Sequence, residues 1–156
     1  MGLLWCKCCL LGKSSSRLSA RSCRINKLGA TITSWTVEGE ELIFLSPRAV
    51  LDGSKAIRGG VPICWPAFGP WSLGSQHGFA RSSVWEVRSE EKQRVTFTLA
   101  ESRAWDQQFL LSYTVSLGET SLDIELTAKN CNTEQAIDFT TALHTYFRLG
   151  SAANSL

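Results

Sequence analysis

The chain has 156 residues, of which 44% are hydrophobic and 19% charged, an ordinary composition for one globular domain with its own core. This composition excludes wholesale disorder, collagen-like repeats and a coiled coil, and no apolar run approaches the roughly 18 residues of a membrane span. The net charge of +2 is uneven: residues 1–37 carry six basic and no acidic side chains, which leaves 10 basic and 14 acidic ones, a net of −4, in the rest. A mildly acidic body argues against a nucleic-acid partner.

Residues 1–18 are expected to form a divergent or disordered head. The stretch 13–24 is rich in Ser and Arg and free of acids, as organelle transit peptides are. The loose alternation of Cys23, Ile25 and Leu28 fits an ordinary strand equally well. The expected location is therefore the cytoplasm, with a plastid or mitochondrion as the alternative if the head is a transit peptide.

Cys6 and Cys9 are the only cysteines with C-x-x-C spacing and no second such pair follows, so the six cysteines predict neither a zinc knuckle nor a disulfide scaffold. We expect isolated cysteines to act as small buried hydrophobes in a reducing compartment. Palmitoylation of the three in the head stays open as an alternative. The positions are Cys6, Cys8, Cys9, Cys23, Cys64 and Cys131.

Alternation with period two predicts β-structure along most of the chain. A short apolar run at 42–45 ends at a Ser-Pro pair, and residues 95–99 alternate between apolar and polar. Residues 109–117 alternate strictly, 118–120 form a turn, and 122–128 alternate again, which predicts a β-hairpin. No segment keeps helical spacing over three turns. The sequence predicts an all-β sandwich or barrel.

Residues 53–83 differ from this pattern, with six of the twelve glycines and three of the four prolines. A long irregular stretch inside a compact domain usually carries function. Its arginines, Arg58 and Arg81, suit a phosphate through forked, charge-assisted hydrogen bonds. Gln76, His77 and several aromatic side chains suit a sugar. The same composition also fits a structural loop with two solvated arginines.

The second candidate is a histidine near the end of the chain. Alternation from 137 to 147 defines one face of a strand and puts His144 on the other face, with Ala142 and Tyr146. A lone histidine on a strand is more often structural than catalytic. It nevertheless titrates in the range that proton transfer at neutral pH requires.

Three stretches in this order, IRGGVPICWPAFGP, QHGFARSSVWEV and TALHTYF, resemble the glucose-6-phosphate 1-epimerase family, the hexose-6-phosphate mutarotases related to aldose 1-epimerases. LGATITSW and FLSPRAVLDGSKAIRGG extend the resemblance upstream. It covers residues 19–149 and leaves 150–156 as a tail unlike the family. It implies an antiparallel β-sandwich of the galactose-mutarotase type, truncated at the C-terminal end.

The resemblance also implies an activity, the interconversion of the α and β anomers of a hexose 6-phosphate by acid–base ring opening. His144 matches the catalytic histidine, the general acid on the ring oxygen. Arg58 and Arg81 match the positions that hold the phosphate, and His77 would hydrogen-bond the sugar with Gln76 beside it. Neither a metal nor an organic cofactor is implied, because a hemiacetal opens by proton transfer alone.

One part of the family pattern is missing. The family's general base is a glutamate well downstream of TALHTYF, whereas this chain ends 12 residues after His144 and its last glutamate, Glu134, precedes the motif. We therefore expect a fragment, a truncated gene prediction or a splice variant, with uncovered apolar sheet faces and open edges that favour aggregation.

Two other hypotheses about the function stay open. A non-catalytic sugar-phosphate-binding fragment or pseudoenzyme would keep the arginines and lack the base. A lectin-like domain for neutral sugars fits the aromatic side chains but leaves Arg58 and Arg81 without a role.

Overall fold

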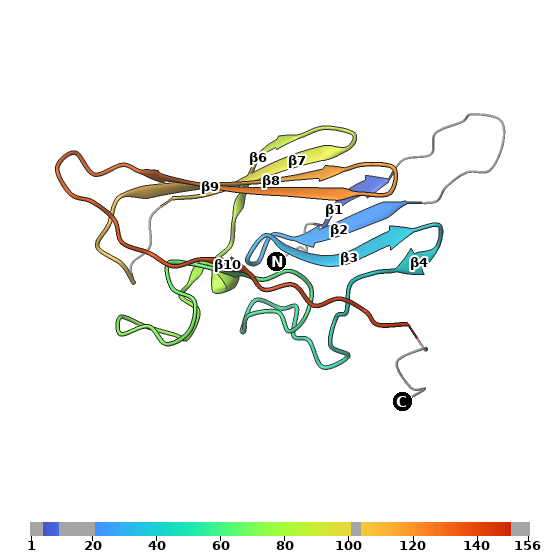
Figure 1. Cartoon of the computed structure of the whole chain (residues 1–156), viewed down its shortest axis with the longest axis horizontal. Coiled ribbons are helices and arrows are strands. Elements are labelled where there is room, and N and C mark those ends of the chain that lie inside the picture. The colour runs from blue at the N-terminus through green and yellow to red at the C-terminus, as the bar shows by residue number, and fades with distance from the viewer. Residues whose placement is uncertain (1–4, 10–20, 101–103, 151–156) are drawn as a thin grey trace.

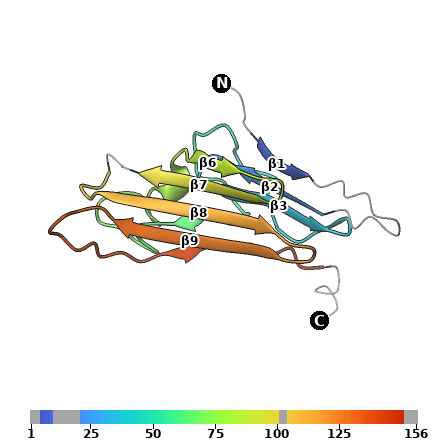
Figure 2. The same ribbon diagram turned by 90° about the horizontal axis from the view of Figure 1, so that it is seen from above.

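The computed structural model describes residues 5–9, 21–100 and 104–150, which form two antiparallel four-stranded sheets (Figures 1 and 2). The first sheet has the order β1 (Trp5–Cys9), β2 (Ser22–Asn26), β3 (Thr31–Val37), β4 (Glu40–Glu41). The second has the order β6 (Glu86–Glu90), β7 (Arg94–Ala100), β8 (Phe109–Leu117), β9 (Leu122–Asn130). A short pair, β5 (Ile63–Cys64) with β10 (Ala142–Leu143), and a 3₁₀ turn, η1 (Ala80–Ser82), complete the described elements.

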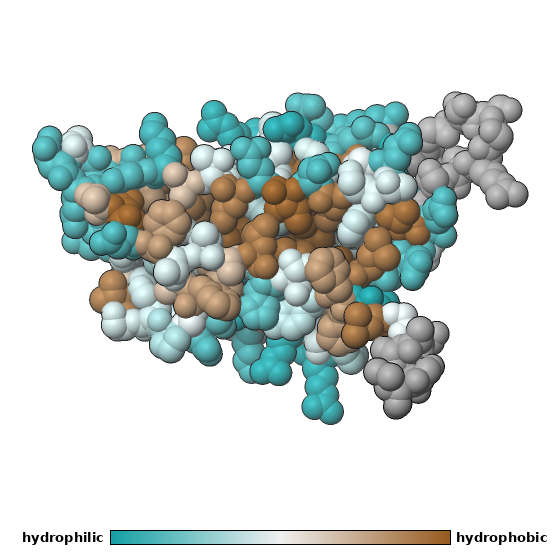
Figure 3. Space-filling model, in the orientation of Figure 1, coloured by the Kyte–Doolittle hydropathy of each residue, from teal (hydrophilic) through white to brown (hydrophobic). Residues whose placement is uncertain are grey.

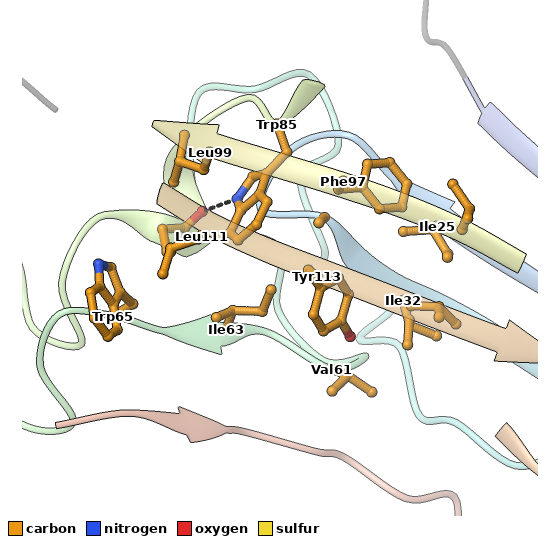
Figure 4. Close-up of a cluster of buried hydrophobic side chains, with 14 of the residues drawn as sticks. Ile25, Ile32, Val61, Ile63, Trp65, Trp85, Phe97, Leu99, Leu111 and Tyr113 are labelled. Carbon is orange, nitrogen blue, oxygen red and sulfur yellow. Dashed lines mark hydrogen bonds between the residues drawn. The ribbon is translucent and has the colours of Figure 1, made fainter. Parts of the chain in front are cut away.

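The hydrophobic core lies between the two sheets and draws on both. Ile25 and Ile32 come from the first sheet, and Phe97, Leu111 and Tyr113 from the second, each at most 2% exposed (Figure 4). The connection between the sheets adds Val61, Ile63, Trp65 and Trp85 to the same cluster. Burial of apolar surface from both layers is the main stabilising contribution in such a sandwich. The predicted antiparallel all-β sandwich is confirmed.

The predicted hairpin is confirmed residue by residue. β8 and β9 pair from Leu117 opposite Leu122 to Phe109 opposite Asn130. Along β8 every second side chain is buried, which is the burial pattern that strict alternation predicts. The stretch 95–99 falls inside β7.

Two predicted strands are much shorter than expected. The run 42–45 makes only single bridges, from Ile43 to Phe147 and from Leu45 to Gly59, and 137–147 is a strand only at β10. The reason lies in the partner segment of the latter. His144 donates its N–H to the carbonyl of Pro62, 2.9 Å away, but a proline has no N–H to return the bond. The segment is therefore held by an interrupted ladder.

The burial prediction for cysteines is confirmed for Cys23 and Cys64 and wrong for Cys131, which is exposed. Cys131 follows the end of β9, where alternate side chains point away from the core. Its N–H still donates to the carbonyl of Gln108, 2.9 Å away, so the backbone is paired while the side chain faces outward.

Of the predicted head, β1 is the described part, and it pairs with β2 from Trp5 opposite Asn26 to Cys9 opposite Ser22. Residues 10–18 and most of the predicted tail lie outside the described residues. The location in the cell stays a prediction. No helix in the described part of the chain is long and apolar enough to cross a membrane.

Apolar side chains remain uncovered along one face of the molecule. Figure 3 shows them as a band over β9 and the extended segment that contains β10. In this segment Phe147 is 64% and Leu149 78% exposed, and Leu122, Ile124 and Leu126 of β9 are half-buried. The described residues therefore expose a patch of the kind that marks an interaction surface or an aggregation hazard.

The core also contains buried polar groups without a hydrogen-bond partner among the described residues, and one of them allows a test of the packing. The Tyr113 hydroxyl is buried without a hydrogen-bond partner among the described residues, and burial, reinforced by Cys23, raises the pKa of Tyr113 far above its usual range. Tyr113→Phe should raise the free energy of unfolding by about 1 kcal/mol at pH 7, measured by urea denaturation.

The advantage of Tyr113→Phe should grow above about pH 10. There the wild-type phenol ionises in the unfolded chain but not in the fold, so wild-type stability is lost as pH rises. Tyr146→Phe, at a side chain 39% exposed, is the matched control and should show no such growth. A Tyr113→Phe variant that unfolds more easily than wild type would contradict the packing described above.

Candidate active site

One cleft of about 770 Å³ brings all five predicted site residues together. Its described lining carries four cationic side chains, two imidazoles and no carboxylate. The cationic residues are Arg48, Lys55, Arg58 and Arg81, the imidazoles are His77 and His144, and Gln76 completes the predicted set. Positive charge thus gathers at one place, although residues 38–156 together carry a net charge of −4.

His144 is positioned by main-chain hydrogen bonds between segments far apart in sequence. Its N–H donates to the carbonyl of Pro62, and the N–H of Tyr146 donates to the carbonyl of Gly60, both at 2.9 Å. The alternation predicted for this stretch puts both side chains on the cleft side, where their rings stack with centroids 4.9 Å apart.

His77 is held in an unusual backbone conformation, with φ of +66°. Its N–H donates to the carbonyl of Gly69 at 2.8 Å, and the N–H of Gly69 donates to its Nδ1 at 3.0 Å. Because Nδ1 accepts, the neutral imidazole carries its proton on Nε2. The loop thus fixes both the position and the tautomer of this ring.

The residue after His77 must be glycine. Gly78 has φ of +70°, and a Cβ there would collide with the Trp65 carbonyl. The close approach is maintained by a hydrogen bond of 2.9 Å from the N–H of Phe79 to that carbonyl. The buried Trp65 therefore anchors the loop that carries His77.

The two histidines meet edge to face. The ring centroids of His77 and His144 lie 5.7 Å apart with an interplanar angle of 71°. Phe68 stacks against His77 at 5.3 Å and contacts His144 at 6.3 Å. No described residue hydrogen-bonds the ring nitrogens of His144. The pair therefore offers imidazole nitrogens to a ligand beside an aromatic surface.

The two predicted arginines lie on different segments. Arg81 belongs to η1 and is tied to the other predicted residues, since its Nη2 donates to the backbone carbonyl of Gln76 at 2.6 Å. Arg58 is exposed and precedes the Gly59-Gly60 turn. Within the described residues, neither guanidinium lies within 4.0 Å of a carboxylate.

Arg48 and Lys55 were not predicted from the sequence. Both line the cleft with Arg58, on the loop before it. The available signal was the concentration of cations in FLSPRAVLDGSKAIRGG. This signal is weak, because the sequence does not distinguish a loop Lys or Arg that faces a cleft from one that faces solvent.

The surroundings lower the pKa of His77 below its ordinary value. The first cause is loss of hydration at the cleft, and the charges of Arg81 and His144 act in the same direction. These effects favour the neutral form of the His77 ring, which suits a hydrogen-bonding role.

The described cleft does not provide a carboxylate base. Glu134 is exposed on the connection between β9 and β10 and does not line the cleft. No group of three or more His, Cys, Asp or Glu side chains in the described segments is arranged to hold a metal ion. The described residues can hold an anion and provide an acid, but they present no paired base.

Comparison with known proteins now adds to this geometry. The family described as aldose 1-epimerase matches residues 16–156. The chain belongs to the aldose 1-epimerase family. A Cenchrus ciliaris protein named "Putative glucose-6-phosphate 1-epimerase" is 37% identical over 147 residues, which cover 82% of this chain and 44% of that protein. An Escherichia coli (strain K12) protein of the same name is 36% identical, with 80% and 44% covered. The chain thus spans less than half the length of these relatives.

Solved structures share the fold. A Salmonella typhimurium protein described as "a putative mutarotase" superposes with a TM-score of 0.74 at 31% identity, covering 94% of this chain and 57% of that one. Galactose 1-epimerase from Lactobacillus acidophilus gives a TM-score of 0.64 at 20% identity, covering 96% and 54%. The predicted galactose-mutarotase type of sandwich is therefore confirmed.

Substitution of Gly78 tests how the His77 loop is held. Gly78→Ala should lower the free energy of unfolding by more than 2 kcal/mol, because the added methyl collides with backbone as well as straining φ. Gly53→Ala is the matched control: its φ is +90°, but nothing lies within 4 Å of the added carbon. It should cost about 1 kcal/mol. Equal losses of stability in urea denaturation would contradict the close approach to Trp65.

The two imidazoles can be followed separately by NMR. His77 should titrate below the usual pKa of a histidine, and Arg81→Gln should raise the pKa of His77 by removing a nearby positive charge. Arg88→Gln, at an exposed cation outside the cleft, is the control. If the pKa of His77 is the same in Arg81→Gln as in wild type, the charge of Arg81 does not act on His77, which would contradict this description of the cleft.

Proposed function

We propose that the cleft binds a hexose 6-phosphate and belongs to an epimerase that interconverts its α and β anomers. The observation that carries the proposal is the convergence of two histidines and four cationic side chains on one cleft whose described lining contains no carboxylate. The names of the relatives point to the same substrate class. Because the chain spans less than half of those relatives, the activity of the whole protein is part of the proposal.

The arginines account for the phosphate. A guanidinium presents a planar fork of donors that matches two phosphate oxygens, and Arg58 and Arg81 have no carboxylate partner in the described residues that would compete. Phe68 and Tyr146 offer aromatic faces beside the histidines for the C–H faces of the sugar ring. Neutral His77 donates from Nε2 to a sugar hydroxyl.

His144 is the proposed general acid. It gives a proton to the ring oxygen while a base removes the proton of the anomeric hydroxyl, the bond between C1 and the ring oxygen breaks, and an open-chain aldehyde forms. Rotation about C1–C2 and the reverse transfers close the ring as the other anomer. Atoms and charge balance without an oxidant. In this proposal the base comes from outside the described cleft.

A second candidate is binding of sugar phosphates without catalysis. The absence of a carboxylate among the described lining residues favours it, since an acid without its partner base holds the substrate but does not turn it over efficiently. The two candidates share the phosphate site and differ only in the exchange of anomers.

Two-dimensional exchange NMR on the anomeric protons of glucose 6-phosphate separates these candidates. Exchange faster than the spontaneous rate, reduced about 10²-fold by His144→Ala, is the result expected of the epimerase once its base is supplied from outside the described cleft. Saturable binding with only spontaneous exchange would establish the binding candidate instead.

Arg81→Gln tests the phosphate contact in the same samples. It should weaken glucose 6-phosphate binding and leave any binding of neutral glucose unchanged, because only the phosphorylated sugar presents an anion. A chain that binds glucose as well as glucose 6-phosphate would favour the lectin-like reading. A chain that binds neither would overturn the proposal.

A further inference from the structure

The connection between β4 and β5 contains a loop, residues 47–57, that is closed at its base. The N–H of Ser46 donates to the carbonyl of Arg58 at 3.1 Å, and that of Gly60 donates to the carbonyl of Phe44 at 2.8 Å. Leu45 and Gly59 form a bridge between these bonds. In Figure 1 the loop hangs below β3 and β4, beside the extended segment that carries His144.

Turns inside the loop shape both of its arms. The Ser46 hydroxyl accepts the N–H of Arg48 at 3.2 Å, and its carbonyl accepts that of Ala49 at 2.9 Å. On the other arm the Asp52 carboxylate accepts the N–H of Ser54 at 2.9 Å. Such local bonds reduce the number of conformations open to the loop. Arg48 and Lys55 therefore stand near the two ends of a closed loop, and both line the cleft.

The charges of these two residues are not cancelled. Arg21–Glu119 is the ion pair within 4.0 Å among the described residues, so neither Arg48 nor Lys55 takes part in one. Asp52 is the acidic residue of the same loop: hydrogen bonds from Ser54 chiefly lower its pKa, with a smaller contribution from Lys55. Asp52 itself does not line the cleft. Together with Arg58 and Arg81, the two cations make a positive potential that faces the cleft.

We infer that the 47–57 loop is a specificity element for the anionic substrate, in which Arg48 and Lys55 form a second cationic pair opposite the phosphate. This inference rests on the proposed function. The pair favours phosphorylated over neutral sugars, and the phosphate dianion over the monoanion, by adding positive charge close to the ligand. Because both side chains are exposed, their contribution falls as salt increases.

Calorimetric titration with glucose 6-phosphate tests the loop on the 156-residue chain. The variants are Arg48→Gln, Lys55→Gln and the double substitution, at low and high salt. The double variant should weaken binding roughly tenfold at low salt and less at high salt. The charge-preserving Arg48→Lys should retain most of the affinity. Circular dichroism before each titration establishes that the variant is folded.

Matched controls remove charge elsewhere. Arg88→Gln and Lys92→Gln neutralise exposed cations that do not line the cleft, and together they should leave the affinity unchanged. If the control pair loses as much affinity for glucose 6-phosphate, the effect depends on the net charge of the protein and not on the loop, and the inference is overturned.

The remaining outcomes separate the inference from the proposed function. Wild-type affinity in the folded double variant, with binding lost in Arg58→Gln, would overturn the role of the loop and leave the phosphate site standing. Absence of binding by the wild-type chain would overturn the proposed function and, with it, the inference.

Discussion

The site depends on the hydrogen bonds that hold residues 140–148 against residues 58–66. The N–H groups of Thr140, His144 and Tyr146 donate to carbonyls of the earlier segment, and two of those carbonyls belong to prolines that return no bond. The earlier segment is in turn fixed to the first sheet. Val61 donates to the carbonyl of Ile32 at 3.0 Å. The imidazole of His144 is thus held in a fixed position relative to the core of the sandwich.

The same segment also organises the rest of the cleft. At the far end of this segment, the main-chain N–H of the buried Trp65 donates to the carbonyl of His77 at 3.3 Å. The main-chain carbonyl of Trp65 accepts the N–H of Phe79. At its near end Arg58 closes the base of the loop that carries Arg48. Both imidazoles and the cations therefore share one support. A ligand that touches one of them is expected to touch the others, which is the positioning that acid–base chemistry requires.

The sequence predicted the strands in which apolar side chains are buried and polar side chains are exposed. β8 alternates strictly because one face meets the core and the other meets solvent. β3 gave no such signal, since the run Thr31–Ser34 is buried on both faces. The five site residues were singled out by the composition of one irregular stretch and by strand alternation, and the resemblance to a family supplied their roles. Arg48 and Lys55 were not predicted, because their approach to the cleft depends on how the 47–57 loop closes.

The most direct test of a single shared site is NMR of the two imidazole Hε1 signals during titration. The signals of His77 and His144 should shift together as glucose 6-phosphate is added, with one dissociation constant, because the rings lie 5.7 Å apart in one cleft. Inorganic phosphate should reproduce part of the response, and neutral glucose should not. Signals that shift with different dissociation constants, or that do not respond to glucose 6-phosphate, would contradict the account.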